Sequence, residues 1–135
     1  MADAMRVMLA EDDEALRDIV ARALENAGME VATAGNGAQA LAAIAEGRFD
    51  AVILDMIMPG MNGLAVLENL KRAQKSVPVV LISGHVGLLE ERRFRELGAA
   101  SVVKKPFGLD ELTQIVLAVV EDGDPQPQVP RETLA

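Results

Sequence analysis

AVILDMIMPGMNG, residues 51–63, joins a short apolar run to a turn, and the residue at the junction is Asp55. Three other apolar runs end in the same way, on residues capable of chemistry. The other junctions are residues 6–10 before Glu11, Asp12 and Asp13; residues 79–82 before Ser83; and residues 101–103 before Lys104, Lys105 and Pro106. Such β-branched runs are typical of buried strands in a parallel sheet, whose carboxyl ends meet at one edge where ligands bind. The sequence therefore predicts a pocket that gathers carboxylates, a hydroxyl and an ammonium.

Segments of helical period separate the apolar runs. Expected helices cover residues 14–27, 38–45 (ended by Gly47), 64–70, 88–97 and 109–120, and residues 29–33 form a further expected strand. Apolar side chains recur at i, i+3, i+4 and i+7 in the first and last of these helices, whereas arginines interrupt the pattern in residues 88–97. Five βα units predict an α/β fold in which helices cover both faces of the sheet, a three-layer sandwich with right-handed crossovers.

Composition narrows the functional classes. The chain has 135 residues, a formal net charge of −8 and a sequence pI near 4.6, which opposes direct binding to nucleic acid. It has no cysteine, which excludes disulfides, thiol catalysis and Cys-ligated zinc. No apolar stretch approaches the roughly 20 residues that span a bilayer, and the N-terminus does not resemble a secretory signal. We expect a cytoplasmic protein without membrane contact.

One folded domain is expected, over residues 5–121. Residues 122–135 are rich in proline, glutamine and acid, and they offer too little apolar surface to offset the entropy lost on ordering. We expect a disordered tail there and no output domain after it, so that the domain stands alone.

Acidic residues gather at two of the junctions. Two carboxylates about 4 Å apart repel each other by roughly 4 kcal/mol at an effective dielectric constant of 20, so a shared pocket requires a cation. Oxygen ligands without nearby His or Cys favour Mg²⁺. Alternatively, Glu11, Asp12 and Asp13 only cap the first helix, where acids are favourable, but this reading does not account for Asp55.

Asp55 can serve either as a metal ligand or as a nucleophile that accepts a phosphoryl group. Phosphoryl transfer needs in-line positioning, a metal, and cationic and hydrogen-bonding partners for the phosphoryl oxygens. Lys105 and Ser83 are residue types that supply such contacts. Because all of these residues are expected at one edge of the sheet, phosphoryl chemistry is favoured over an ordinary turn serine and a solvated lysine.

These junctions resemble the motifs of the receiver domains of two-component response regulators. The matching features are Glu11-Asp12, Asp55 with Met58-Pro59 and Asn62-Gly63, Ser83-Gly84, and Lys105-Pro106-Phe107. All four occur in the family's order and spacing, and the resemblance covers residues 5 to about 121. It implies a flavodoxin-like, doubly wound (βα)5 fold with strand order 2-1-3-4-5. It also implies that a sensor histidine kinase or phosphotransfer protein donates a phosphoryl group to Asp55.

The resemblance also implies roles for individual residues. Asp12 and Asp55 would bind Mg²⁺ directly, Glu11 through water and Ile57 through its carbonyl, while Lys105, Ser83 and the Gly84 amide would contact phosphoryl oxygens. The Lys105–Pro106 peptide bond is expected to be cis. The implied protein is a signalling domain that assists its own phosphorylation and dephosphorylation rather than an enzyme. The surface formed by residues 88–97, 101–103 and 109–120 would contact a downstream protein, and a weak dimer is compatible with the pattern.

Two positions depart from the family pattern. Val102 stands where the family commonly has Tyr or Phe, which places the familiar aromatic switch in doubt. Ile57 is apolar where some relatives have a polar residue that helps to position the attacking water. The single histidine, His85, is expected to be a partly exposed loop residue.

Three alternatives to a phosphorylated receiver fit the sequence less well. Residues 35–40 fit the Gly-x-Gly-x-x-Ala dinucleotide fingerprint, but that reading leaves Glu11-Asp12, Ser83 and Lys105 unexplained. An aspartyl-phosphate phosphohydrolase of the haloacid dehalogenase type requires a second aspartate two residues after the first, and this chain has Ile57 there. A receiver-like interaction module that is never phosphorylated is disfavoured by the intact set of polar residues.

Overall fold

The computed structural model describes residues 4–84 and 87–122, in which five strands alternate with five helices. The strands are β1 (Arg6–Ala10), β2 (Glu30–Ala34), β3 (Ala51–Asp55), β4 (Val79–Ser83) and β5 (Ala99–Lys104). The helices are α1 (Glu14–Asn26), α2 (Gly37–Glu46), α3 (Gly63–Arg72), α4 (Leu88–Glu96) and α5 (Leu109–Asp122). The expectation for His85 lies outside the described residues, as does the expected tail at residues 122–135 except for Asp122, which belongs to α5 rather than to a tail.

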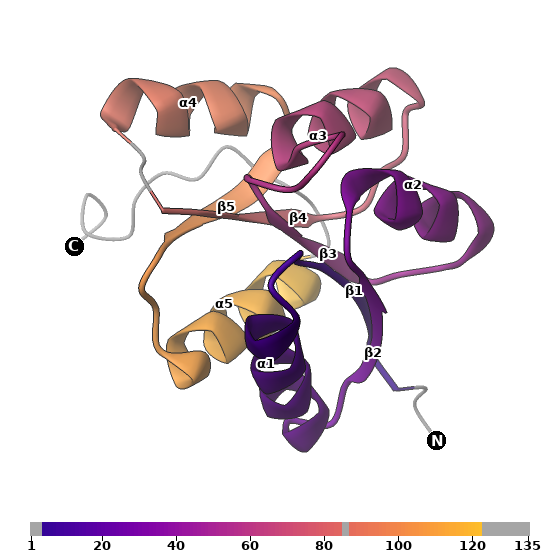
Figure 1. The fold of residues 1–135 in the computed structure, drawn as a ribbon, viewed down its shortest axis with the longest axis vertical. Helices are drawn as coiled ribbons and strands as arrows, with labels where there is room; N and C mark the ends of the chain where they lie inside the picture. Colours follow the sequence, from indigo (N-terminus) through magenta and orange to yellow (C-terminus); the bar gives the residue numbers. More distant parts are fainter. Residues whose placement is uncertain (1–3, 85–86, 123–135) are drawn as a thin grey trace.

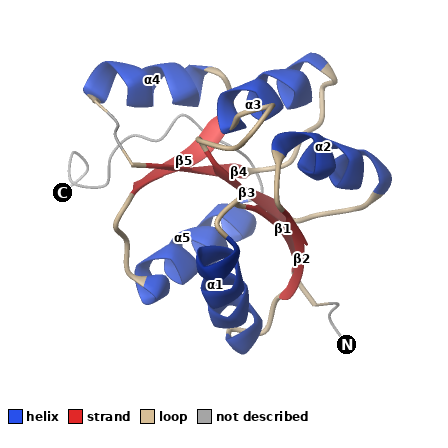
Figure 2. Ribbon diagram, viewed as in Figure 1, coloured by secondary structure: helices blue, strands red, loops and turns tan. Residues whose placement is uncertain are grey.

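The strands form one parallel sheet in the order β2-β1-β3-β4-β5. Helices α1 and α5 cover one face, and α2, α3 and α4 cover the other (Figures 1 and 2). The expected flavodoxin-like three-layer fold is therefore confirmed. The connections leave β1 and β3 toward opposite faces of the sheet, and this switch point is where open α/β sheets form a crevice at their carboxyl ends.

The core has two layers, one on each side of the sheet. Every residue of β3 and β4 is buried, as expected for central parallel strands covered on both faces. Side chains alternate between the faces: Leu54 and Leu81 pack toward α2, α3 and α4, while Ile53 and Val80 pack toward α1 and α5. This explains why the strands read as continuous apolar runs in the sequence.

Side-chain caps fix the start of three helices. Asp13, Asn36 and Asn62 accept hydrogen bonds from the backbone N–H groups of Leu16, Gln39 and Ala65, respectively. Each cap satisfies one of the N–H groups that lack an intrahelical partner and contributes about 1 kcal/mol. The caps stand between the strand ends and the helices, and they therefore determine where each helix leaves the polar edge of the sheet.

Most element boundaries differ from the sequence-based expectations by one or two residues, and three of these differences are informative. Strand β5 begins at Ala99, because Ala99 and Ala100 lie in the buried sheet although neither is β-branched. Strand β2 is shifted by one residue, and Met29 is buried just before it. Helix α5 continues to Asp122. None of the helices in the described residues is long and apolar enough to cross a membrane.

The dinucleotide-like glycine pattern has a packing explanation. Gly37 opens α2, and a Cβ atom at this position would overlap the carbonyl oxygen of Met61 and lie 2.9 Å from a methyl group of Val66. The glycine thus allows α2 to approach α3 and the loop that follows β3. The helix cap itself is supplied by Asn36.

Candidate functional site

The carboxyl ends of β1, β3, β4 and β5 bring the expected polar residues to one edge of the sheet. In the register of the sheet, Ala10 lies beside Leu54, Asp55 beside Ile82, and Ser83 beside Lys104. Glu11 and Lys105 are the residues that directly follow β1 and β5. The parallel arrangement alone therefore collects groups that are up to 94 positions apart in the sequence.

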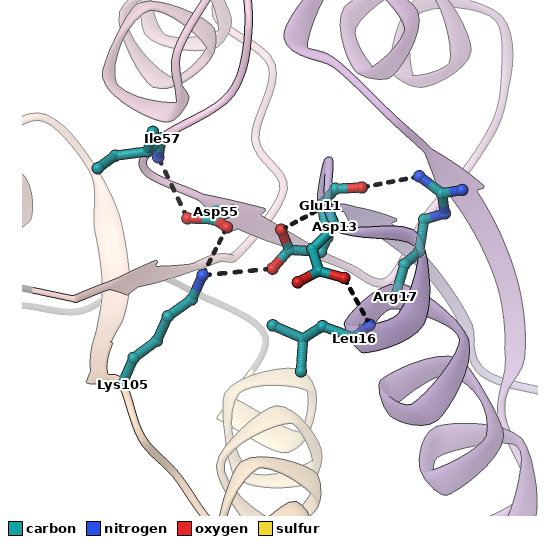
Figure 3. Close-up of polar contacts among 7 residues, drawn as sticks. All are labelled: Glu11, Asp13, Leu16, Arg17, Asp55, Ile57 and Lys105. Carbon is teal, nitrogen blue, oxygen red and sulfur yellow. Dashed lines mark hydrogen bonds and ion pairs between the residues drawn. The ribbon is translucent and has the colours of Figure 1, made fainter.

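Lys105 is the cation at the centre of this edge. Its Nζ atom donates to Oδ2 of Asp55 at 2.8 Å and to Oε1 of Glu11 at 3.5 Å (Figure 3). Both carboxylate residues are only 3% exposed. The other oxygen of Asp55, Oδ1, accepts from the backbone N–H of Ile57 at 3.1 Å. Both oxygens of Asp55 are thus held in place, one by the turn after β3 and one by the lysine that follows β5.

The site carries more negative than positive charge. Burial raises the pKa of Glu11 from 4.5 to about 7, and the hydrogen bond and charge of Asp55 act in the same direction, against the Asp13 amide and Lys105. Desolvation lowers the pKa of Lys105, but its hydrogen bond to Asp55 and the charges of Asp55 and Glu11 outweigh this effect, so the pKa lies above 10.5. The charge of the cluster therefore favours the binding of an additional cation or proton near neutral pH.

The acids after β1 divide between two tasks. Oδ1 of Asp13 caps α1, whereas ligand oxygens of Glu11, Asp12 and Asp55 all lie within 4.8 Å of one another. The capping alternative is thus right for Asp13 and does not explain the other two. Carboxylate oxygens at this spacing, without any sulfur or imidazole ligand among them, suit a hard divalent ion such as Mg²⁺. The donor set of this edge therefore fits the expected metal.

The remaining expected residues lie around this cluster. Ser83 is buried at the end of β4, and its carbonyl oxygen accepts from the backbone N–H of Lys105 at 2.8 Å. Gly84 is exposed beside it. The Lys105–Pro106 peptide bond is cis, as the resemblance implied. Ile57 is 74% exposed, so its side chain lies open to solvent next to the Asp55 carboxylate.

Val102, the position of the missing aromatic residue, is half-buried. It pairs with Leu81 in the sheet and packs against the core layer that faces α4. Val102 is thus part of the packed sheet, and the doubt about the aromatic switch continues to rest on the residue type at this position.

Two residues support the site in ways that were not predicted from the sequence. Arg17, on α1, donates from Nη1 to the carbonyl oxygen of Glu11 at 2.9 Å. Gly63 lies against the backbone of β3, where a Cβ atom would come within 2.5 Å of the carbonyl oxygen of Asp55. An arginine on a polar helix face gives no local signal of this contact. The Asn62-Gly63 pair did belong to the recognised motif, but the steric reason for the glycine depends on tertiary packing.

An open, mainly apolar groove of about 590 Å³ borders the site on the side of α1 and α5. Its lining residues are Leu16, Ile19, Gly84, Lys105, Pro106, Phe107 and Leu109. Ile19 and Leu109 are more exposed than most large apolar side chains of this chain. The groove places an apolar surface directly beside the Lys105 ammonium.

Comparison with known proteins identifies related sequences and structures. The family model of the response regulator receiver domain matches residues 7–117. The DNA-binding response regulator MtrA of Mycolicibacterium paratuberculosis is 35% identical over 122 residues, which cover 90% of this chain and 54% of that regulator. The DNA-binding transcriptional regulator NtrC of Azospirillum brasilense is 30% identical over 129 residues, which cover 96% of this chain and 27% of that protein. The chain thus spans about half, or less, of the length of these curated relatives.

A solved structure agrees with the sequence relatives. The receiver domain of NtrX from Brucella abortus is 33% identical and superimposes with a TM-score of 0.78, over 85% of this chain and 98% of that domain. The match covers almost the whole of the solved domain.

Proposed function

This chain belongs to the response regulator receiver domain family, and on that premise we propose that Asp55 is the residue that accepts the phosphoryl group. The observation that carries the proposal is the surroundings of its carboxylate. It is buried at the carboxyl end of β3, it contacts Lys105 at 2.8 Å, and oxygens of Glu11 and Asp12 lie within 4.8 Å. Asp12, the other aspartate of this cluster, is exposed, whereas Asp55 is buried.

Mg²⁺ is the proposed cofactor. We assign Asp12 and Asp55 as direct ligands, Glu11 as a ligand through water, and the Ile57 carbonyl as the backbone contribution. Asp12 is exposed and can reach an ion from the solvent side, whereas buried Glu11 already accepts hydrogen bonds from Asp13 and Lys105. When bound, the ion offsets the negative charge shared by the carboxylates and the incoming phosphoryl group.

The proposed transfer uses Asp55 as a nucleophile toward a phosphohistidine. A carboxylate oxygen forms a bond to phosphorus, the P–N bond breaks with its electron pair on the imidazole nitrogen, and the imidazole, protonated at its other nitrogen, leaves neutral. The product is an acyl phosphate. Lys105 then exchanges its contact with Oδ2 for a phosphoryl oxygen, because the negative charge has moved outward by one group.

Ser83 and the Gly84 amide are proposed to bind the other phosphoryl oxygens. Their place at the end of β4, next to the strand that carries Lys105, supports this role. We propose that the domain assists both its own phosphorylation and a slow hydrolysis. The exposed Ile57 side chain has no group that can orient water, which supports slow hydrolysis.

The phosphoryl donor is proposed to be a sensor histidine kinase or a phosphotransfer protein in the cytoplasm. The open groove beside Lys105 supports an approach from the side of α1 and α5, because it exposes apolar surface next to the site. The surface formed by α4, β5 and α5 is proposed to contact a downstream protein. The relatives MtrA and NtrC are DNA-binding regulators, but the net charge of −8 supports a protein rather than nucleic acid as the direct partner of this segment.

The proposal is tested by phosphorylation with phosphoramidate and Mg²⁺, followed by intact-mass measurement. We expect one added phosphoryl group on the wild type, none after addition of EDTA and none on Asp55→Ala. Asp50→Ala, which removes an exposed aspartate at the opposite edge of the sheet, is the matched control and should be modified normally. Stable modification of Asp55→Ala would move the acceptor elsewhere, and an unmodified wild type would favour the interaction-module alternative.

A further inference from the structure

Arg17 links the loop after β1 to the loop after β2. It lies in the second turn of α1, and its guanidinium donates to the carbonyl oxygen of Glu11 at 2.9 Å. Figure 3 shows this contact on the side of Glu11 opposite to Lys105. The peptide unit whose oxygen accepts this bond is the one that joins Glu11 to Asp12. The arginine therefore touches the connection between two proposed contributors to the metal site and neither of their carboxylates.

Other hydrogen bonds hold the backbone N–H and the side chain of Glu11. Its N–H donates to the carbonyl oxygen of Ala34 at 3.0 Å, and its Oε2 accepts from the Asp13 N–H at 3.1 Å. The carbonyl oxygen of Glu11 accepts its side-chain hydrogen bond from Arg17. Without it, the Glu11–Asp12 peptide plane would lose the hydrogen bond to its carbonyl oxygen, and a rotation of this plane would move the Asp12 carboxylate relative to Asp55.

Gly35 provides the space that the guanidinium occupies. A Cβ atom at Gly35 would lie 3.1 Å from Nη1 of Arg17, and the Gly35 N–H donates to Oε1 of Gln39 at 3.0 Å. Within the described part of the chain, no carboxylate lies within 4.0 Å of the Arg17 nitrogens. The arginine is thus held as a hydrogen-bond donor to a carbonyl, in a space lined by glycine, and not as half of a salt bridge.

We propose that Arg17 is a positioning residue for the metal site, holding the Glu11–Asp12 peptide so that both carboxylates converge on the same point as Asp55. This inference rests on the proposed function, because it assumes that these carboxylates bind Mg²⁺. Groups outside the ligand shell commonly affect metal affinity by orienting the ligands.

When Arg17 is replaced by a neutral residue, the loss of charge and the loss of positioning are expected to change the Mg²⁺ affinity in opposite directions. Removal of a positive charge near a cation site strengthens cation binding through the electrostatic interaction alone. Loss of the hydrogen bond to the Glu11 carbonyl weakens it, because Asp12 is no longer held toward the ion. The direction of the change in Mg²⁺ affinity therefore separates the two effects.

The experiment measures the Mg²⁺ dissociation constant by ¹⁵N NMR titration, following the amides of residues 11–13 and 55–57. Tryptophan and tyrosine are absent from the sequence, so intrinsic fluorescence is not a useful probe. We expect Arg17→Met to raise the dissociation constant by about tenfold. Arg22→Met is the matched control, because Arg22 is exposed on the same helix and its loss changes the net charge equally. This control should bind Mg²⁺ as tightly as the wild type or slightly more tightly.

Two further variants distinguish positioning from a loss of folding. Arg17→Lys keeps a donor and should recover part of the affinity, while thermal unfolding followed by circular dichroism reports the stability of every variant. Gly35→Ala crowds the guanidinium and should weaken Mg²⁺ binding in the wild type but not in Arg17→Met. Arg17→Met binding that is equal to or tighter than wild type overturns the inference alone. A wild type without any Mg²⁺-dependent shift overturns the metal site and this inference together.

Discussion

The amino edge of the sheet, where the parallel strands begin, and the carboxyl edge, where they end, carry similar charged residues in different arrangements. At the amino edge, the Arg6 backbone N–H donates to Oδ2 of Asp50 at 2.8 Å, and its guanidinium donates to the carbonyl oxygen of Arg48 and lies 5.1 Å from the centroid of the Phe49 ring. These contacts are exposed, and the Asp50 carboxylate and the Arg6 guanidinium each have a hydrogen-bond partner. They join the start of β1 to the residues before β3.

At the carboxyl edge, carboxylates outnumber the cations that contact them. Glu11 and Asp55 are buried and share the single ammonium of Lys105. Burial of like charges is unfavourable unless a cation or proton compensates. The contacts at the amino edge therefore stabilise the fold. The buried carboxylates at the carboxyl edge lower the stability of the fold and favour the binding of a cation. Changes at the two edges should accordingly affect different measurements.

The largest expected effect is on Mg²⁺ affinity at the carboxyl edge. Asp12→Ala removes a proposed direct ligand and should raise the dissociation constant by more than about tenfold, whereas Glu11→Gln should raise it less, because that ligation is proposed to run through water. NMR titration measures both, with Asp50→Ala as the control from the amino edge. Unchanged affinity in Asp12→Ala would remove the proposed distinction between the edges.

The next effect is on stability, and its size depends on pH. Because the pKa of Glu11 is raised from 4.5 to about 7 on folding, the folded state binds the proton more tightly. The stabilisation from this proton is complete below pH 4.5 and is lost as the pH rises through about 7, at a total cost of up to about 3 kcal/mol.

Glu11→Gln removes this charge. Urea unfolding in EDTA should therefore show a variant more stable than wild type at pH 8, with the difference disappearing toward pH 4.5. The same difference at both pH values would show that ionisation of Glu11 does not cause it.

A smaller effect is expected at the amino edge. Asp50→Ala removes the acceptor of the Arg6 N–H and should lower the free energy of unfolding by about 1 kcal/mol, since the bond is exposed. Unlike the effect of Glu11→Gln, this loss should be the same at pH 6 and pH 8. Asp18→Ala, which removes an exposed acid of α1, serves as the control and should change stability very little. A change in Mg²⁺ affinity in Asp50→Ala would contradict the separation of the two edges.

The smallest effect is on the response to phosphorylation. Ser83→Ala should still accumulate phosphorylated Asp55, because the nucleophile and the metal ligands remain. Its phosphorylation-dependent NMR shifts across α4 and β5 should nevertheless be smaller than in the wild type, since the proposed hydroxyl contact to the phosphoryl group is gone. Spectra of both proteins with and without phosphoramidate test this, and a full response in Ser83→Ala would assign the coupling to another contact.

Local sequence signals were sufficient for most of the fold. The apolar runs that form β3 and β4 are buried at every residue, so their apolar composition directly indicated strands in the centre of the sheet. The start of β5 was missed because Ala99 and Ala100 are neither β-branched nor large, and their place in the sheet depends on pairing with β4. The alternation of strand-like and helix-like hydrophobic periods therefore predicts the order of the elements better than it predicts their first and last residues.

The sequence alone determined which residues reach the polar edge, because a residue that ends a parallel strand must lie beside the ends of its neighbours. It could not determine how those residues divide their tasks. Asp12 and Asp13 are the same residue type at adjacent positions, yet Asp13 caps α1 and Asp12 belongs to the acidic cluster. The raised pKa of Glu11 and the Arg17 contact to its backbone likewise arise only when loops far apart in the sequence pack together. Residue type and period are local properties, whereas burial, distance and charge environment exist only in the folded chain.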